Sequence, residues 1–174
     1  ARARTSEIWH SPLQYSQTGA KIRRGSIVHI WTIERWKRYV PPQLITSKSH
    51  IHLLCDKNTN GDLKVACHHF IQWAKKEYYF PIPLHVKLKN QVLLKTKDGG
   101  TAVGTFFEPD AYSALPYIKV ATGDYPDLLD SLGRDDALAT ILTVVAHEMT
   151  HYFQWLNALS LTERGRERQA TQYS

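Results

Sequence analysis

The sequence predicts an α+β fold, in which a small, mostly antiparallel sheet packs against helices on one face. Four short stretches alternate apolar with polar residues or are rich in β-branched residues, as strands are: 84–89, 92–97, 101–107 and 117–123. Short turns such as 97–100 join consecutive stretches, which favours antiparallel pairing. Two segments with apolar residues at helical spacing, 62–79 and 135–156, predict the helices that cover the sheet.

The remaining segments give weaker predictions. Residues 26–36 have alternating, β-branched character and predict a strand, or a strand that runs into a short helix near Arg35. Residues 50–55 predict a short strand, followed by a turn at 56–61. Residues 124–136 form an acidic connection with a short helix, and a last helix is expected to begin near Ser160 and reach the C-terminus.

Composition narrows the class of protein. Hydrophobic residues make up 43% and charged residues 22% of the 174 residues, which is typical of a globular domain with its own core. No apolar run reaches the roughly 18–20 residues that a membrane span needs, so no membrane partner is expected. The N-terminal residues lack the apolar core of a secretory signal. With only Cys55 and Cys67, the chain has no disulfide framework, which favours a cytoplasmic location.

Charge is concentrated at the N-terminus. Residues 1–48 hold nine Lys or Arg against two Glu, a net charge of +7, while the whole chain carries +6. We therefore divide the chain into a basic N-terminal arm or subdomain, 1–60, and a second domain, 61–174. A basic arm with interleaved Trp31, Trp36 and Tyr39 is compatible with nucleic acid as a partner. A solvated surface and an aromatic cover on the core are the simpler interpretations.

The most informative motif is His147-Glu148-Met149-Thr150-His151, inside an apolar helical segment. Residues four apart lie on one face of a helix, about 6 Å apart along its axis, so both imidazoles can bind one tetrahedral Zn²⁺. Glu148 points about 100° away. It is placed to hold the water in the open coordination position and to act as general base and acid. Burying this triplet without such a role would be costly.

A third ligand has to come from downstream. No histidine follows His151, and Glu163 and Glu167 are the carboxylates available after the helix. Ser160 and Glu163 fit a capping box at the start of the last helix, which gives Glu163 a structural role. We therefore predict one zinc ion bound by His147, His151 and Glu167, with Glu163 as the alternative ligand.

These motifs resemble a known class of enzyme. The segment VVAHEMTHYFQ resembles the active helix of zincin metallopeptidases, and ERQA at 167–170 resembles the E-x-x-A segment with the third ligand in gluzincins, including the minigluzincins. The resemblance covers roughly residues 62–174. It implies a zincin-like fold, with the third ligand on a helix that follows the active helix. Some relatives have Asp after E-x-x-A, where this chain has Thr171, so the partner that orients a ligating histidine has to come from elsewhere.

The resemblance also implies an activity. The chain would be a zinc-dependent endopeptidase, and the strand segment from Val103 to Phe107 would bind an extended peptide or protein substrate by strand addition. Candidates for an oxyanion stabiliser are Tyr173, Tyr152 and His85. The alternative is a regulatory protein, in which the zincin domain is a sensor and residues 1–48 bind DNA or another partner.

Another possible metal site is weaker. Cys55, Cys67 and His68 lie close in sequence but lack the C-x-x-C spacing of a zinc knuckle. Buried structural cysteines are the favoured interpretation.

Overall fold

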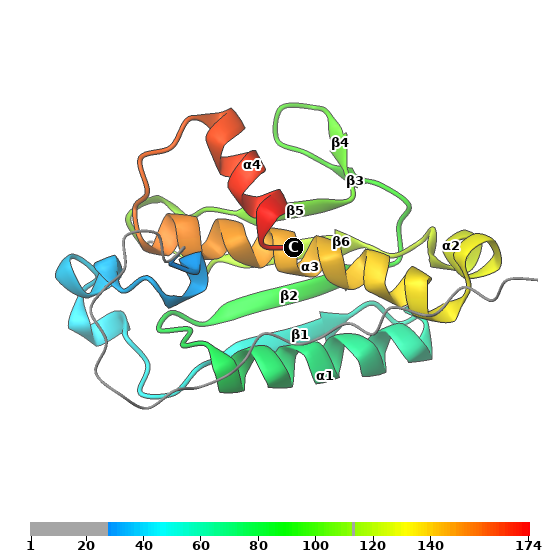
Figure 1. Cartoon of the computed structure of the whole chain (residues 1–174), viewed down its shortest axis with the longest axis horizontal. Helices are drawn as coiled ribbons and strands as arrows, with labels where there is room; N and C mark the ends of the chain where they lie inside the picture. The colour runs from blue at the N-terminus through cyan, green and yellow to red at the C-terminus, as the bar shows by residue number, and fades with distance from the viewer. Residues whose placement is uncertain (1–27, 113) are drawn as a thin grey trace, which may run out of the picture.

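A four-stranded sheet and a layer of helices make up the part of the chain that the computed structural model describes, residues 28–112 and 114–174. The sheet has the order β1-β2-β6-β5. Its strands are β1 (Ile51–Cys55), β2 (Leu84–Lys89), β6 (Tyr117–Ala121) and β5 (Gly104–Phe107). A separate hairpin contains β3 (Leu94–Lys95) and β4 (Thr101–Ala102). The prediction of an α+β fold is confirmed (Figure 1).

The prediction that the sheet is mostly antiparallel was wrong. β1 pairs with β2 and β2 pairs with β6 in parallel, and only β5 and β6 are antiparallel. The reason is the connection between β1 and β2. It contains the 17-residue helix α1 (Gly61–Glu77), which returns the chain to the start of the sheet, as a crossover between parallel strands must.

Three further helices follow the sheet strands. They are α2 (Tyr125–Leu132), α3 (Arg134–Leu156) and α4 (Glu163–Gln172). Gly133 separates α2 from α3 with φ of 82°, a left-handed conformation that glycine adopts without steric cost. The apolar run of the sequence thus forms one helix of 23 residues, which crosses the sheet (Figure 1).

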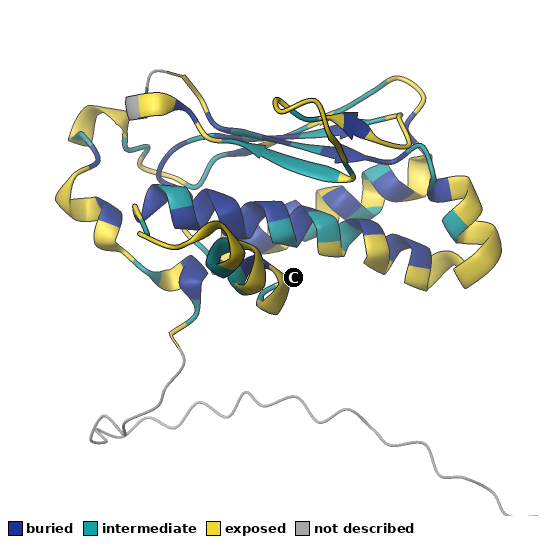
Figure 2. Ribbon diagram, turned by 90° about the horizontal axis from the view of Figure 1, so that it is seen from above, coloured by how far each residue is buried: buried dark blue, intermediate teal, exposed yellow. Residues whose placement is uncertain are grey.

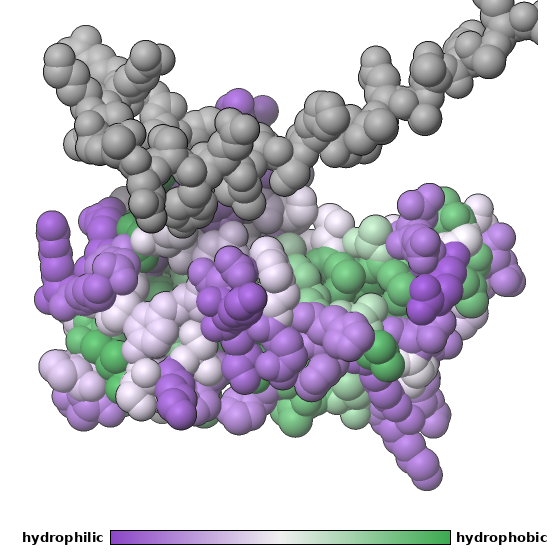
Figure 3. Space-filling model, turned by 60° about the horizontal axis from the view of Figure 1, so that its bottom comes forward, coloured by the Kyte–Doolittle hydropathy of each residue, from purple (hydrophilic) through white to green (hydrophobic). Residues whose placement is uncertain are grey.

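The core lies between the sheet and the helices. Alternate residues of β2 and β6 are buried, among them Val86, Leu88 and Val120, and the buried face of α3 includes Met149 and Phe153. Figure 2 shows the sheet and the helices as two layers. On the outer face of the helix layer, α1 leaves some hydrophobic side chains exposed, and Figure 3 shows such areas interspersed with hydrophilic side chains. In this arrangement α3 packs along the sheet and contributes much of the helix side of the core.

The N-terminal cover differs from the prediction. From residue 28, where the description begins, two 3₁₀ helices, η1 (Ile30–Thr32) and η2 (Arg35–Arg38), take the place of the expected strand, and η2 is the short helix expected near Arg35. A third, η3 (Pro42–Leu44), follows. Trp31 and Trp36 are both buried, which a strand with one buried face would not allow, since residues five apart point to opposite faces. Trp31 Nε1 donates to Thr150 Oγ1 at 2.9 Å, so the aromatic residues of this segment serve as a cover on α3.

Other boundaries also moved. The expected strand 92–97 is limited to β3, and the expected strand 101–107 is interrupted at Val103. A short 3₁₀ helix, η4 (Asp110–Tyr112), lies in the loop before β6. The capping box at Ser160 was wrong, because Thr162 is the N-cap of α4 and its hydroxyl accepts from Gly165 N at 3.2 Å. Within the described ranges, no helix combines the length and apolarity required to cross a membrane.

Candidate metal centre

The middle of α3 carries the two histidines. His147 and His151 lie one turn apart, with ring centroids 4.9 Å from each other. Ala146, Met149 and Tyr152 around them are buried in the core, which holds this part of the helix rigidly against the sheet. The imidazoles therefore project from a support that packing has already fixed.

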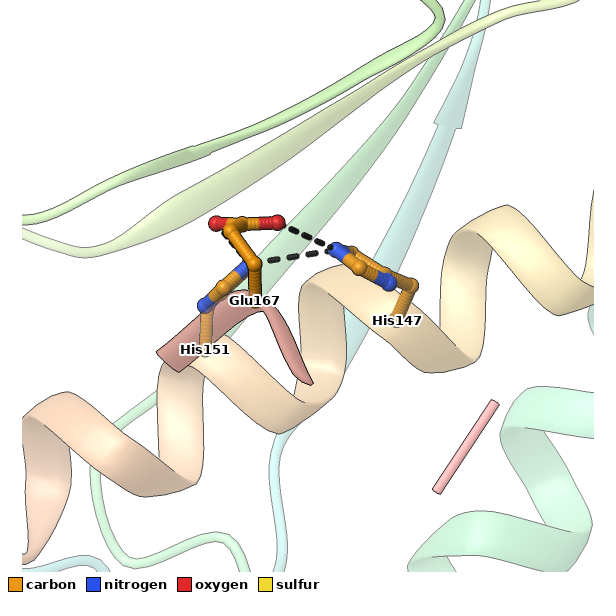
Figure 4. A group of neighbouring side chains, drawn as sticks. All are labelled: His147, His151 and Glu167. Atoms are coloured by element: carbon orange, nitrogen blue, oxygen red, sulfur yellow. Dashed lines mark hydrogen bonds and ion pairs between the residues drawn. The ribbon is translucent and has the colours of Figure 1, made fainter. Parts of the chain in front are cut away.

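The last helix brings a carboxylate to them. Glu167 Oε2 lies 3.2 Å from His147 Nε2, and Glu167 Oε1 lies 3.3 Å from His151 Nε2. The two Nε2 atoms are themselves 3.2 Å apart. Figure 4 shows the three side chains pointing toward one another, two from α3 and one from α4. The residues predicted as metal ligands thus form a compact group, with all ligand atoms within 4.8 Å of one another.

The size of this triangle fits a metal ion. Ligand atoms bound at about 2.0–2.1 Å in a tetrahedron lie about 3.3–3.4 Å from each other. The separation of the two Nε2 atoms, 3.2 Å, and the separations from each nitrogen to its nearer Glu167 oxygen, 3.2 Å to Oε2 and 3.3 Å to Oε1, are close to that edge length. Two imidazole nitrogens and one carboxylate oxygen are a donor set that zinc and neighbouring transition metals accept.

A glutamine holds His151 in the orientation that a ligand needs. His151 Nδ1 lies 2.8 Å from Gln154 Oε1, while Gln154 Nε2 donates to Arg166 O at 2.9 Å and to Gln169 Oε1 at 3.1 Å. Because the amide nitrogen donates to these two oxygens, Gln154 Oε1 accepts from His151 Nδ1. His151 Nε2 then carries the lone pair and faces the triangle. Gln154 also joins α3 to α4.

Glu148 lies against the edge strand. Its side chain is buried, with a relative exposure of 6% for the residue, and it lines the same cleft as the two histidines. A Cβ at Gly104 of β5 would lie 2.6 Å from Glu148 Oε1 and 2.7 Å from Val144 Cγ1. Only glycine at position 104 therefore lets this carboxylate approach the strand backbone without displacement.

The protonation of the site follows from its burial. Burial, and then the charge of Glu167, raise the pKa of Glu148 to about 8. Burial is also the main cause that lowers the pKa of His151, which favours the neutral imidazole. A neutral imidazole is the form that binds metal.

The surrounding cleft has a volume of about 720 Å³. It is lined by residues of α3, of α4 and the loop before it, and of β5, β6 and the β3–β4 hairpin. Figure 1 shows how these elements are arranged. Arg166 on α4 pairs with Glu108 at 2.7 Å. Glu163, the alternative ligand, lines the cleft but is not part of the three-residue group.

None of the three candidates for an oxyanion stabiliser lines this cleft in the described residues. Tyr173 donates to Val28 O at 3.3 Å, and Tyr152 is fully buried and donates to Ile82 O at 2.8 Å. His85 lies on β2, where its ring contacts that of His52. Each of these three side chains therefore has a partner elsewhere in the fold.

The cysteine cluster does not form a second centre among the described residues. Cys67 is fully buried on α1, and burial raises the pKa of its thiol to about 12. Both cysteines are free thiols. The favoured interpretation of Cys67 as a buried structural residue agrees with this environment.

Some residues of the site were not identified from the sequence. Gln154 lies three residues after His151, and that helical spacing was the available signal. No sequence pattern indicated Gly104 or the lysines that line the cleft, because their role depends on strand pairing and on the position of the hairpin. Comparisons of the chain with protein-family models, with curated proteins and with solved structures found no match.

Proposed function

We propose that this protein is a zinc-dependent endopeptidase of the gluzincin type. The observation that carries the proposal is the convergence of His147 Nε2, His151 Nε2 and the Glu167 carboxylate beside a buried glutamate: the two nitrogens lie 3.2 Å apart, and each has one of the two carboxylate oxygens at 3.2 or 3.3 Å. A cytoplasmic location, favoured by the two free thiols, is part of the same proposal.

Each residue has a separate role in this proposal. His147, His151 and Glu167 would hold one zinc ion, which supplies a Lewis acid and lowers the pKa of a bound water to about 7. Glu148 takes a proton from the attacking water and later gives it to the leaving amine.

The edge strand would hold the substrate. β5 is the terminal strand in the sheet order, and Gly104, Thr105, Phe106 and Phe107 all line the cleft. A peptide added to the outer edge of β5 would pair through main-chain hydrogen bonds. Because Glu148 lies against Gly104 and the two histidines line the same cleft, a peptide bond beside this strand would lie near the carboxylate and the candidate ligands.

The test is the substitution Glu148→Gln, which keeps the shape of the side chain and removes the base. We expect zinc content to stay at one ion per chain and peptide cleavage to fall about 100- to 10,000-fold, the usual contribution of general acid–base catalysis. Metal content is measured by mass spectrometry and cleavage with a quenched fluorescent peptide library. Glu77→Gln on α1, outside the cleft, is the control. Full activity of Glu148→Gln, or a wild-type chain that takes up no metal, would refute the proposal.

A further inference from the structure

We propose that the cleft selects peptides with acidic side chains, which are bound by three lysines on the sheet side, Lys95, Lys97 and Lys119. We call these three residues the lysine wall. The inference rests on the proposed function, since it assumes that an extended peptide lies along β5. It adds the class of substrate, which neither the zinc ligands nor Glu148 define.

The three lysines of the wall have no direct carboxylate partner among the described residues. Lys95 lies on β3, Lys97 in the turn after it and Lys119 on β6, and all three line the cleft. Among the described residues, none of them forms a salt bridge. The opposite wall is different, because it carries the carboxylates of Glu163 and Glu167, and its Arg166 is already paired with Glu108. Three free positive charges on one side of a cleft attract negatively charged groups.

Aromatic rings help to position two of the three ammonium groups. Lys97 Nζ lies 4.6 Å from the centroid of the Phe107 ring, and Lys119 Nζ lies 5.5 Å from that of Tyr117. The two rings stack on each other with centroids 4.6 Å apart. Such cation–π contacts restrict the lysine side chains before a ligand arrives, which lowers the entropy cost of binding.

Strand pairing brings this wall next to alternate residues of the peptide. Gly104 faces α3, so Thr105 points to the opposite face of the sheet. Thr105 is paired with Lys119 on β6. A peptide on the outer edge of β5 therefore has one set of side chains toward α3 and the histidines. The other set lies on the face of Thr105 and Lys119, where acidic residues at alternate positions would meet the lysines.

Nucleic acid fits this surface less well. Proteins that bind single strands offer aromatic ring faces for base stacking. Here the faces of Phe107 and Tyr117 are occupied by each other and by lysines, with Lys87 Nζ 4.0 Å from the Tyr117 centroid. The surface thus offers positive charge with little free stacking area, which favours carboxylates on an extended peptide.

The test measures binding on the zinc-loaded Glu148→Gln chain, so that it does not depend on cleavage. Two fluorescent ten-residue peptides are compared by anisotropy, identical except for two Glu or two Gln at alternate positions. We expect the Glu peptide to bind about tenfold more tightly, at about two- to fivefold per charge pair, and to lose this preference at 1 M salt. Substituting Lys95, Lys97 and Lys119 by Gln should bring the ratio close to one, and Lys119→Gln alone should reduce it about two- to fivefold.

Lys87→Gln is the matched control, since Lys87 shares the Tyr117 ring but does not line the cleft. Its ratio should stay within about twofold of that of the parent chain. Equal binding of both peptides, or an undiminished preference in the triple variant, would overturn the inference. Tighter binding of an oligothymidylate than of the Glu peptide would favour nucleic acid instead. Acidic preference without cleavage by the wild type would count against the proposed peptidase activity and not against the lysine wall.

Discussion

The two helices that supply the candidate ligands differ in how the protein holds them. α3 has thirteen buried residues and crosses the whole sheet, whereas α4 has one, Ala170. The contacts of α4 are mostly polar. They include the hydrogen bond from Gln154 to Arg166 O, the Arg166–Glu108 pair and the hydrogen bond from Tyr173 to Val28 O.

This difference shows how the centre is assembled. The two histidines are positioned by core packing, and their geometry is set when the domain folds. Glu167 is exposed and depends on the docking of a short polar helix. We infer that a metal would stabilise the docked position of α4 much more than it stabilises α3, because binding can only favour a state that binds it better.

The largest expected effect comes from removing one ligand on each helix. His151→Ala and Glu167→Ala should both lower zinc affinity more than about 100-fold, since even loss of an outer partner of a ligand costs about 10- to 100-fold. With chelator present, His151→Ala should also lose about 1–3 kcal/mol of stability, because its imidazole is buried and hydrogen-bonded. Glu167→Ala should stay within about 0.5 kcal/mol of wild type. Chelator competition and urea unfolding measure the two quantities, and equal destabilisation would contradict the contrast between the helices.

The next effect concerns the amide between the helices. Gln154→Leu removes the acceptor for His151 Nδ1 and the donor to α4, so zinc affinity should fall about 10- to 100-fold. Gln169→Leu, which removes only an acceptor of Gln154, should change it less than about threefold. If both variants bind zinc like the wild type, His151 does not need this orientation.

A larger side chain at a buried alanine can distinguish an effect on the docking of α4 from an effect on the stability of the whole domain. Ala137 on α3 and Ala170 on α4 are both fully buried, and replacing either by Leu should cost about 1–3 kcal/mol. Only Ala170→Leu should also weaken zinc binding, because it moves the helix that carries Glu167. A similar loss of zinc affinity in Ala137→Leu would show that the centre responds to the whole core.

The smallest effect is a pH dependence at the end of α4. The centroids of the His29 and Tyr173 rings lie 4.6 Å apart, and burial lowers the pKa of His29 below its ordinary value of 6.5. The folded state therefore favours the neutral imidazole, and its stabilising contribution is lost as pH falls below about 6.5. In chelator, the urea midpoint of His29→Gln should decrease less between pH 7.5 and 5.5 than that of the wild type. An identical decrease would mean that other groups cause it.

The sequence predicted correctly those features that depend on residues close together in the chain. Helical spacing predicted α1 and α3, and the position of His147 and His151 on one face needs only the geometry of a helix. Glu167 could be selected because few carboxylates follow His151, although its distance to the imidazoles depends on how α4 docks. These features require no knowledge of strand order.

Non-local features could not be predicted in this way. Parallel pairing of β1 with β2 follows from the path of α1, while the alternation of the two strands is the same for either direction. The N-terminal 3₁₀ helices depend on hydrogen bonds to residues more than a hundred positions away. Trp31 Nε1 donates to Thr150 on α3, and the backbone N–H of Trp36 donates to Asn157, which follows α3. The contact between Gly104 and Glu148 and the convergence of the lysine wall arise only when β5, β6 and the hairpin are assembled.

Gly104 limits how this cleft can be redesigned. Any side chain at this position would collide with the carboxylate of Glu148, so under the proposed function residue 104 cannot be varied to change which peptides are bound. The turn of the β3–β4 hairpin and the loop before α4 are exposed, and such segments tolerate replacement and insertion. Under the proposed function, we therefore expect changes of specificity, whether evolved or engineered, to occur in the hairpin turn and in that loop, while residue 104 on β5 remains glycine.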